Sequence, residues 1–161
     1  MPPLNSFSLA PELETCAWFN TEQPLYLSAL RGKVIVIVAF QMLCPGCVSH
    51  SLPQASALQK FHSTSQLQVI GLHAVFEHHH VMTQEALQVF IAEYGLNFAI
   101  AVDQPSTVEA LPKTMSKLQL HGTPSIVLID KQGRIRLNHF GHLHDLQLGS
   151  IIGRLLAETF D

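Results

Sequence analysis

The sequence predicts an α/β fold in which a central mixed β-sheet is flanked by helices. The segment Val34–Phe40 is almost entirely β-branched and apolar, which is typical of a central strand buried on both faces. Strand-like and helix-like segments then alternate as far as Val102, which indicates parallel strands joined by crossover helices. A hairpin with a glycine turn follows and adds antiparallel strands.

The elements are expected in a simple order along the chain. Residues 1–24 form a turn-rich N-terminal arm, and residues 25–160 form the core of a single domain spanning 1–161. A short strand is expected at 25–27, and Thr83 and Gly95 suit the start and the stop of a helix. The other strands are expected at 34–40, 67–76, 98–102, 125–130 and 134–140, and helices at 48–62, 83–94, 112–118 and 144–160.

Composition supports a folded protein and excludes several functional classes. Hydrophobic residues make up 47% of the chain and charged residues 13%, which argues against disorder. The net charge of −3 provides no basic excess for binding nucleic acid. The longest apolar run, Val34–Phe40, is far shorter than the ~20 residues of a membrane span. Met1–Ser6 lacks the basic and apolar regions of a secretory signal, so we expect a cytoplasmic location.

Two cysteines lie where the predicted central strand passes into a helix, in the motif Cys44-Pro45-Gly46-Cys47. Free N–H groups and the positive dipole at a helix N-terminus stabilise a thiolate on Cys44, and Pro45 suits the first helical position. Cys47 follows about one turn later, so the pair can cycle between dithiol and disulfide. A half zinc site is the alternative, but the remaining cysteine, Cys16, cannot supply a second ligand pair.

A second motif, Gly122-Thr123-Pro124, directly precedes the strand expected at 125–130. Proline cannot donate to a strand ladder, so it is tolerated at the start of a strand or at a sheet edge. Taken alone, the motif favours an ordinary trans turn, because an X–Pro bond is cis only ~5% of the time; a cis Thr123–Pro124 bond is the alternative.

Together these motifs resemble the thioredoxin superfamily, and more narrowly the TlpA-like branch of the redoxin group, which is related to the AhpC/TSA antioxidant proteins. The resemblance covers roughly residues 24–160. It implies a thioredoxin-like fold with an N-terminal extension and the activity of a thiol–disulfide oxidoreductase. In such proteins Cys44 would attack, Cys47 would resolve the mixed disulfide, and Thr123, before a cis Pro124, would offer its backbone to the substrate.

The same resemblance implies the reaction partners. The substrate would be a protein or small-molecule disulfide, and a thiol reductant of unidentified kind would restore the dithiol. No organic cofactor is implied, because the protein's own sulfurs carry the electrons.

The proton relay departs from the family pattern. Thioredoxins carry a buried carboxylate where this chain has Val38, and TlpA-like proteins often have a glutamate where this chain has His50. His50 could relay a proton or could be an ordinary surface histidine. Glu77, after the second predicted strand, is another candidate, although a loop glutamate is usually just solvated.

An AhpC/TSA-type antioxidant peroxidase is an alternative function. Peroxiredoxins use the pattern Pro-x-x-x-Thr-x-x-Cys, whose threonine helps to hold the peroxide. Counted back from Cys44, the threonine position holds Gln41 and the proline position holds Ile37, so the pattern is not matched.

A Cys/His metal-binding, chaperone-like module is a second alternative. His121 could join Cys44 and Cys47 as a third soft ligand, although copper-delivery proteins of this fold use a longer Cys-x-x-x-Cys spacing. The run His78–His80 could also bind metal, but consecutive histidines diverge on an extended chain. We therefore expect no metal site.

Overall fold

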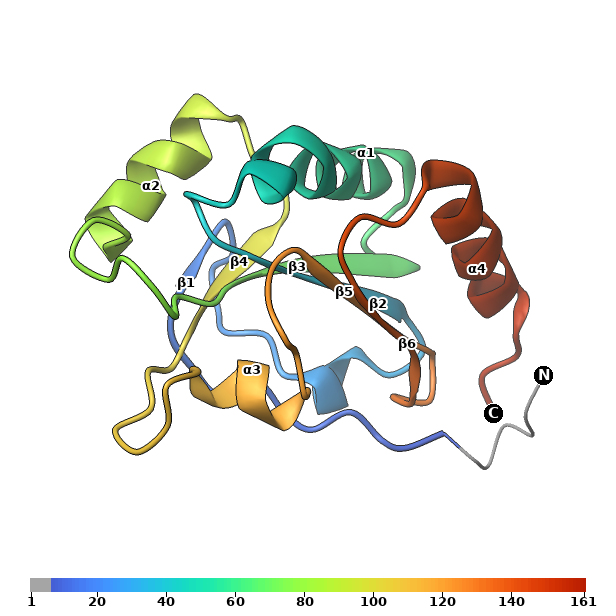
Figure 1. Ribbon diagram of the computed structural model, residues 1–161. Helices are drawn as coiled ribbons and strands as arrows, with labels where there is room; N and C mark the ends of the chain where they lie inside the picture. The colour runs from blue at the N-terminus through green and yellow to red at the C-terminus, as the bar shows by residue number, and fades with distance from the viewer. Residues whose placement is uncertain (1–6) are drawn as a thin grey trace.

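The computed structural model describes residues 7–161 (Figure 1). Met1–Ser6, on which the expectation about a secretory signal rests, lies outside the described residues. The described chain contains a six-stranded sheet in the order β1-β4-β3-β2-β5-β6. The strands are β1 (Thr15–Phe19), β2 (Val34–Phe40), β3 (Leu67–His73), β4 (Ala99–Asp103), β5 (Ser125–Ile129) and β6 (Ile135–Phe140).

Strand β2 lies inside the sheet, parallel to β3 and antiparallel to β5. β3 also pairs with β4 in parallel, while the outer strands β1 and β6 run antiparallel to β4 and β5. Every residue of β2 is buried, which is the burial that its β-branched apolar run predicts. The predicted central mixed sheet is therefore confirmed.

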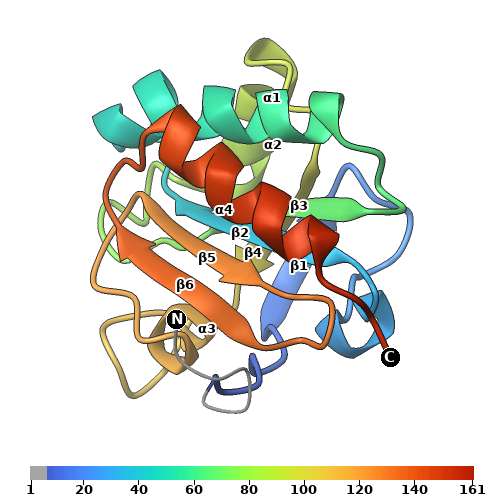
Figure 2. The ribbon, with the colours of Figure 1, turned by 90° about the vertical axis from the view of Figure 1, so that its right-hand side faces the viewer.

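Helices cover both faces of the sheet (Figures 1 and 2). Even-numbered β2 side chains face one hydrophobic cluster, to which α1, α2 and α4 contribute, and odd-numbered ones face a second cluster with α3 and the 3₁₀ helix η2. The helices are η2 (Leu27–Leu30), α1 (Leu52–Phe61), α2 (Gln84–Glu93), α3 (Lys113–Lys117) and α4 (Asp145–Ala157). Within residues 7–161, none of them is long and apolar enough to cross a membrane.

The N-terminal part differs from the prediction in two ways. Thr15–Phe19 forms edge strand β1, so the sheet extends into the segment that the sequence assigns to an arm. β1 is half-buried and contacts one neighbouring strand, so it lacks the apolar pattern of an inner strand. Leu27–Leu30 forms a 3₁₀ helix instead of the strand expected at 25–27, because the distant carboxylate of Glu12 accepts the N–H groups of Leu27 at 2.8 Å and Ser28 at 2.7 Å.

The helix after the cysteine motif begins at Pro45, earlier than the predicted start at residue 48, and its segment Cys47–Ser51 is π-helical. There the N–H of Leu52 reaches back to the carbonyl of Cys47. Pro53 explains the wide turn, because proline has no N–H and its ring would clash with the carbonyl four residues earlier in a regular α-helix. The turn that carries Cys47 is therefore shaped by a proline further along the same helix.

The β5–β6 turn holds the end of α4. Lys131 Nζ donates to the carbonyls of Leu156 and Glu158, both at 2.7 Å, as expected for a cation at a helix C-terminus. Arg136 is almost fully buried and pairs with Asp130 at 3.2 Å and with Glu158 at 2.7 Å. The hairpin and the end of the chain thus form one polar unit.

Strand β3 ends in a buried histidine, before the predicted end at residue 76. His73 is 1% exposed, and its ring packs on Phe40 with the centroids 5.1 Å apart. Its Nε2 has no hydrogen-bond partner among the described residues. Burial lowers the pKa of His73 to about 4, so the ring is neutral at pH 7.

We expect His73 to make the protein acid-sensitive. The unfolded chain takes up a proton below about pH 6.5, whereas the folded His73 does so only near a pKa of about 4, so stability falls between these values. When the pH is lowered from 7.5 to 5, protonation of His73 in the unfolded chain should reduce the free energy of unfolding by about 2 kcal/mol. Urea unfolding at the two pH values measures this. His73→Phe should abolish most of the loss, whereas exposed His79→Gln should keep it; an equal loss in His73→Phe would contradict the prediction.

Candidate active site

The two pairings of β2 bring three chain segments to one edge of the sheet. Ala39 pairs with Ser125 in the antiparallel ladder, so the residues before Ser125 lie beside the end of β2. Phe40 pairs with His73 in the parallel ladder, so the loop after β3 leaves from the same edge. The cysteine motif follows β2 directly. Strand register therefore assembles the candidate site from segments that are distant in sequence.

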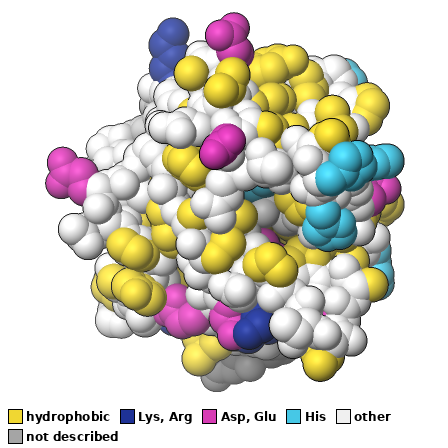
Figure 3. Space-filling view, turned by 90° about the vertical axis from the view of Figure 1, so that its left-hand side faces the viewer, with side chains coloured by type: hydrophobic (Ala, Val, Ile, Leu, Met, Phe, Trp, Pro, Cys, Tyr) yellow, Lys and Arg dark blue, Asp and Glu magenta, His cyan; other side chains and the backbone are white. Residues whose placement is uncertain are grey.

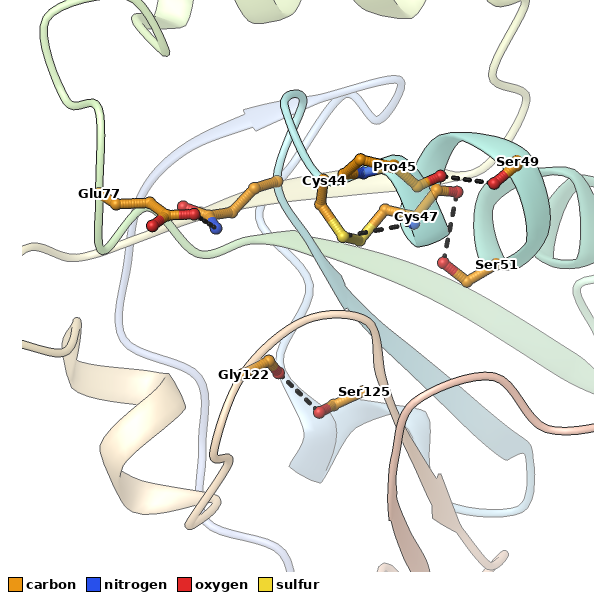
Figure 4. The surroundings of a disulfide bond; sticks show 9 residues. Cys44, Pro45, Cys47, Ser49, Ser51, Glu77, Gly122 and Ser125 are labelled. Carbon is orange, nitrogen blue, oxygen red and sulfur yellow. Dashed lines mark hydrogen bonds between the residues drawn. A yellow bond between two sulfur atoms is a disulfide. The ribbon is translucent and has the colours of Figure 1, made fainter.

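Cys44 and Cys47 are joined by a disulfide at this edge, with their Cα atoms 5.2 Å apart (Figure 4). The backbone N–H of Cys47 points at Sγ of Cys44 at 3.3 Å, so a free helix N-terminal donor reaches this sulfur. Cys44 is partly exposed, whereas Cys47 is fully buried. The pair thus has one sulfur that a substrate can reach and one that it cannot.

The Thr123–Pro124 segment forms the opposite wall, and its peptide bond is cis, as predicted. A Cβ placed on Gly46 would lie 3.5 Å from Cδ of Pro124, so the proline packs against the cysteine motif. The carbonyl of Pro124 accepts the N–H of Gly141 at 2.8 Å, which ties this wall to the loop after β6. Thr123 is half-buried beside it.

Gln41, a buried glutamine beside the cysteines, makes side-chain contacts that the sequence analysis did not predict. Gln41 is 2% exposed, and its backbone carbonyl accepts the N–H of Cys44 at 3.2 Å. Its side-chain Oε1 accepts the N–H of Phe76 at 3.2 Å, and its Nε2 lies 3.5 Å from Oε1 of Glu77. Gln41 thus links the cysteine loop to the loop after β3. Only the presence of an uncharged polar residue at the end of an apolar strand signals this role.

The two proton-relay candidates lie in different surroundings. Glu77 is exposed, and its side chain extends in the direction of the cysteine motif (Figure 4). One of its carboxylate oxygens lies 3.5 Å from the side-chain nitrogen of Gln41. His50 is also exposed, but its ring lies against that of His142, with the centroids 4.8 Å apart. Val38, in the position of the thioredoxin carboxylate, is buried in the apolar core.

The remaining histidines and Cys16 do not join the pair into a metal site. Across residues 7–161, no group of three or more His, Cys, Asp or Glu side chains is arranged to hold a metal ion, and this covers His121 and His78–His80. Cys16 lies on β1, which β4 and β3 separate from β2, so about 14 Å of sheet lies between it and the cysteine strand. Burial raises the pKa of the Cys16 thiol.

The surface around the site carries little charge. The end of β2 and the start of the cysteine helix lie at the left in Figure 1, and Figure 3 views the molecule from that side. Hydrophobic side chains and uncharged surface cover most of this face; Lys and Arg are few, Asp and Glu side chains are scattered over it, and histidines gather at its right-hand side (Figure 3). Leu43, the residue before Cys44, is 58% exposed and contributes to this apolar character.

A family model described as Redoxin matches residues 8–146, a range that contains both cysteines and Pro124. The chain belongs to the redoxin family. It therefore carries the Cys44–Cys47 pair within a redoxin domain, as the sequence motifs predict.

Solved structures confirm the thioredoxin-like fold. The crystal structure of a thioredoxin-like superfamily protein has a TM-score of 0.92 and 49% identity, covering 95% of this chain and 99% of that chain. The crystal structure of a thiol-disulfide isomerase from Corynebacterium glutamicum has a TM-score of 0.91 and 51% identity, covering 97% of this chain and 100% of that one.

Curated relatives match one part of much longer proteins. NHL repeat-containing protein 2 from Bos taurus is 25% identical over 144 residues, or 87% of this chain. Protein DipZ from Mycobacterium tuberculosis is 28% identical over 141 residues, or 86% of this chain. This chain spans 19% of the length of each of these two relatives.

We expect Gln41 to fix the loop after β3. Gln41→Leu keeps a similar volume but leaves the N–H of half-buried Phe76 without its acceptor, which should lower the unfolding free energy by about 1 kcal/mol. Urea unfolding and hydrogen exchange at the Phe76 amide measure the effect. Glu77→Gln serves as the control, because it leaves the Phe76 bond in place and should change stability little. Unchanged exchange protection in Gln41→Leu would show that the bond does not hold the loop.

Proposed function

We propose that the protein is a thiol–disulfide oxidoreductase in which Cys44 and Cys47 cycle between dithiol and disulfide. The observation that carries the proposal is the unequal exposure of the two bonded sulfurs at a helix N-terminus: Cys44 is partly exposed and Cys47 is buried. The 51% identity to the thiol-disulfide isomerase from Corynebacterium glutamicum supports the same activity. In this proposal the reaction begins at the accessible sulfur, Cys44.

The proposed reaction transfers two electrons. The Cys44 thiolate attacks one sulfur of a substrate disulfide in line, which forms a mixed disulfide and releases the other substrate sulfur as a thiolate. Cys47 loses its proton and attacks Sγ of Cys44, so the second substrate sulfur leaves and the Cys44–Cys47 disulfide forms. A thiol reductant then restores the dithiol, and the reverse sequence would oxidise a dithiol partner.

Thr123 and Pro124 are proposed to bind the substrate backbone. Pro124 packs against Gly46, so a chain bonded to Cys44 would pass beside Thr123. The low charge of the surrounding face favours protein disulfides with apolar flanking residues. The electrons travel on the protein's own sulfurs, so the reaction requires no organic cofactor.

Glu77 is proposed to take the proton of Cys47, with Gln41 as its positioning residue. The support is position: the carbonyl of Gln41 accepts the N–H of Cys44, the disulfide partner of Cys47, and the side chain of Gln41 lies 3.5 Å from the carboxylate of Glu77. A bridging water could complete such a relay. His50 is the weaker candidate, because its ring is engaged with His142.

No described contact favours the peroxidase or the metal-binding alternative. Gln41 stands where the peroxidase pattern has threonine, and its amide is already bonded to Phe76 and Glu77. The expected cytoplasmic location stays a prediction.

Replacing Cys44 and replacing Cys47 should block different steps of the reaction. Cys44→Ser should abolish reduction of a peptide disulfide, because no thiolate remains at the accessible position. Cys47→Ser should instead accumulate a mixed disulfide with the peptide, which non-reducing mass spectrometry detects and dithiothreitol releases. Turnover by Cys44→Ser, or peroxide consumed faster than the peptide disulfide, would overturn the proposed function.

The relay can be tested by pH dependence. Glu77→Gln should slow resolution of the mixed disulfide on the order of 100-fold at pH 6, and the deficit should shrink at pH 9, because hydroxide from the solvent can then replace the carboxylate as the proton acceptor. His50→Gln is the matched control and should follow the wild-type profile. Single-turnover release of the reduced peptide gives the rates. If His50→Gln shows the deficit and Glu77→Gln does not, the assignment is reversed.

A further inference from the structure

A groove between α1 and α4 begins at Ser49 and His50, within one helical turn of Cys47, and is unused by the reaction described above. It encloses about 780 Å³. The two helices lie side by side over the same face of the sheet (Figure 2). α1 contains ten residues, which gives this wall a length of roughly 15 Å, the span of about four or five extended residues.

One end of the groove is linked to both walls of the candidate active site through neighbouring residues of the chain. His50 lines the groove and lies one turn after Cys47 in the same helix. Its ring packs on His142, which lines the opposite side. The neighbour of His142, Gly141, donates its N–H to the carbonyl of Pro124 at 2.8 Å. A chain bonded to Cys44 and passing Pro124 would enter the groove past the histidine pair.

The lining of the groove selects an uncharged occupant. No Lys or Arg lines it, and its one carboxylate, on Asp145, already accepts the amide of Gln54 at 2.7 Å. Aliphatic side chains, among them Leu58 and Ile152, form much of its wall. At the far end Phe61 is 84% exposed and extends the apolar surface.

Two glycines of α4 make room for a bound chain. A Cβ placed on Gly149 or Gly153 would meet no atom within 4 Å, and both residues line the groove one turn apart. Glycine in a helix interior costs stability relative to alanine. These positions leave open space into which a ligand's side chains or backbone can enter.

We propose that this groove binds an apolar segment of the polypeptide whose disulfide is presented to Cys44. The inference rests on the proposed function and narrows its substrate to proteins with an apolar stretch near the reacting cysteine. The histidine pair lies at the junction, where the segment passes from the cysteine to the groove. A polypeptide is favoured over a small ligand because the groove begins one helical turn after Cys47, and its opposite side is tied to Pro124 through Gly141.

The test compares two peptide disulfides that differ only beside the cysteine, one with a leucine-rich and one with a serine-rich segment. The small, uncharged bis(2-hydroxyethyl) disulfide reports on the cysteines alone. Gly149→Leu fills the groove, and it should fold because the new side chain enters open space and favours helix. Ser150→Leu is the control: it adds the same side chain to an exposed position of α4 outside the groove.

The wild type and Ser150→Leu should prefer the leucine-rich peptide. Gly149→Leu should raise KM for that peptide about 10-fold, the loss expected when about one buried leucine is excluded. Rates with bis(2-hydroxyethyl) disulfide should not change. Equal KM for the two peptides in the wild type, or a dimer in sedimentation that Gly149→Leu abolishes, would overturn the proposal.

A binding measurement separates this proposal from the proposed function. The leucine-rich peptide with serine in place of its cysteine, labelled with a fluorophore, cannot exchange with the disulfide; it should bind the oxidised protein and lose about 10-fold in affinity with Gly149→Leu. If no disulfide is reduced by the wild type, the proposed function fails, and this anisotropy titration still decides the groove. Equal binding to wild type and Gly149→Leu would reject the groove as the binding site.

Discussion

Burial of β2 on both faces and pairing along both of its edges is the constraint on which the site depends. A strand that is buried in this way has its register fixed, since a slip by one residue would turn its apolar side chains to the wrong faces. The parallel partner then delivers the loop with Glu77 to the end of β2, and the antiparallel partner delivers Pro124. Cys44 and Cys47 follow in the chain itself, so packing in the core determines the geometry of the chemistry.

Local patterns predict the parts of this structure that depend on local forces. The β-branched run of β2 gives its bounds, Thr83 caps α2 by accepting the N–H of Ala86 at 3.2 Å, and Gly95 has the positive φ of a helix stop. The cysteine motif and Pro124 were recognisable because their spacing follows a known family pattern. Fold class and the two principal halves of the site were therefore accessible from the sequence.

The rest depends on contacts between distant segments, which no local pattern contains. Glu12 caps the 3₁₀ helix η2, in a segment whose sequence predicted a strand. Gln41 accepts the backbone N–H of Phe76, from the loop after β3. His50 faces His142 because α4 packs beside α1, an arrangement that helical periodicity alone does not specify. His73 lies inside the strand expected at 67–76, and only strand pairing shows that it ends the strand, buried against Phe40.

The polar unit at the end of α4 has a practical consequence for protein engineering. Truncation after Ala157 would remove Glu158, one of the two carboxylates that neutralise Arg136, a side chain that is only 2% exposed. It would also remove one of the two carbonyls held by Lys131. An affinity tag or fusion partner attached here should therefore follow Asp161 through a flexible spacer, so that the last turn keeps its ionic contacts with the hairpin.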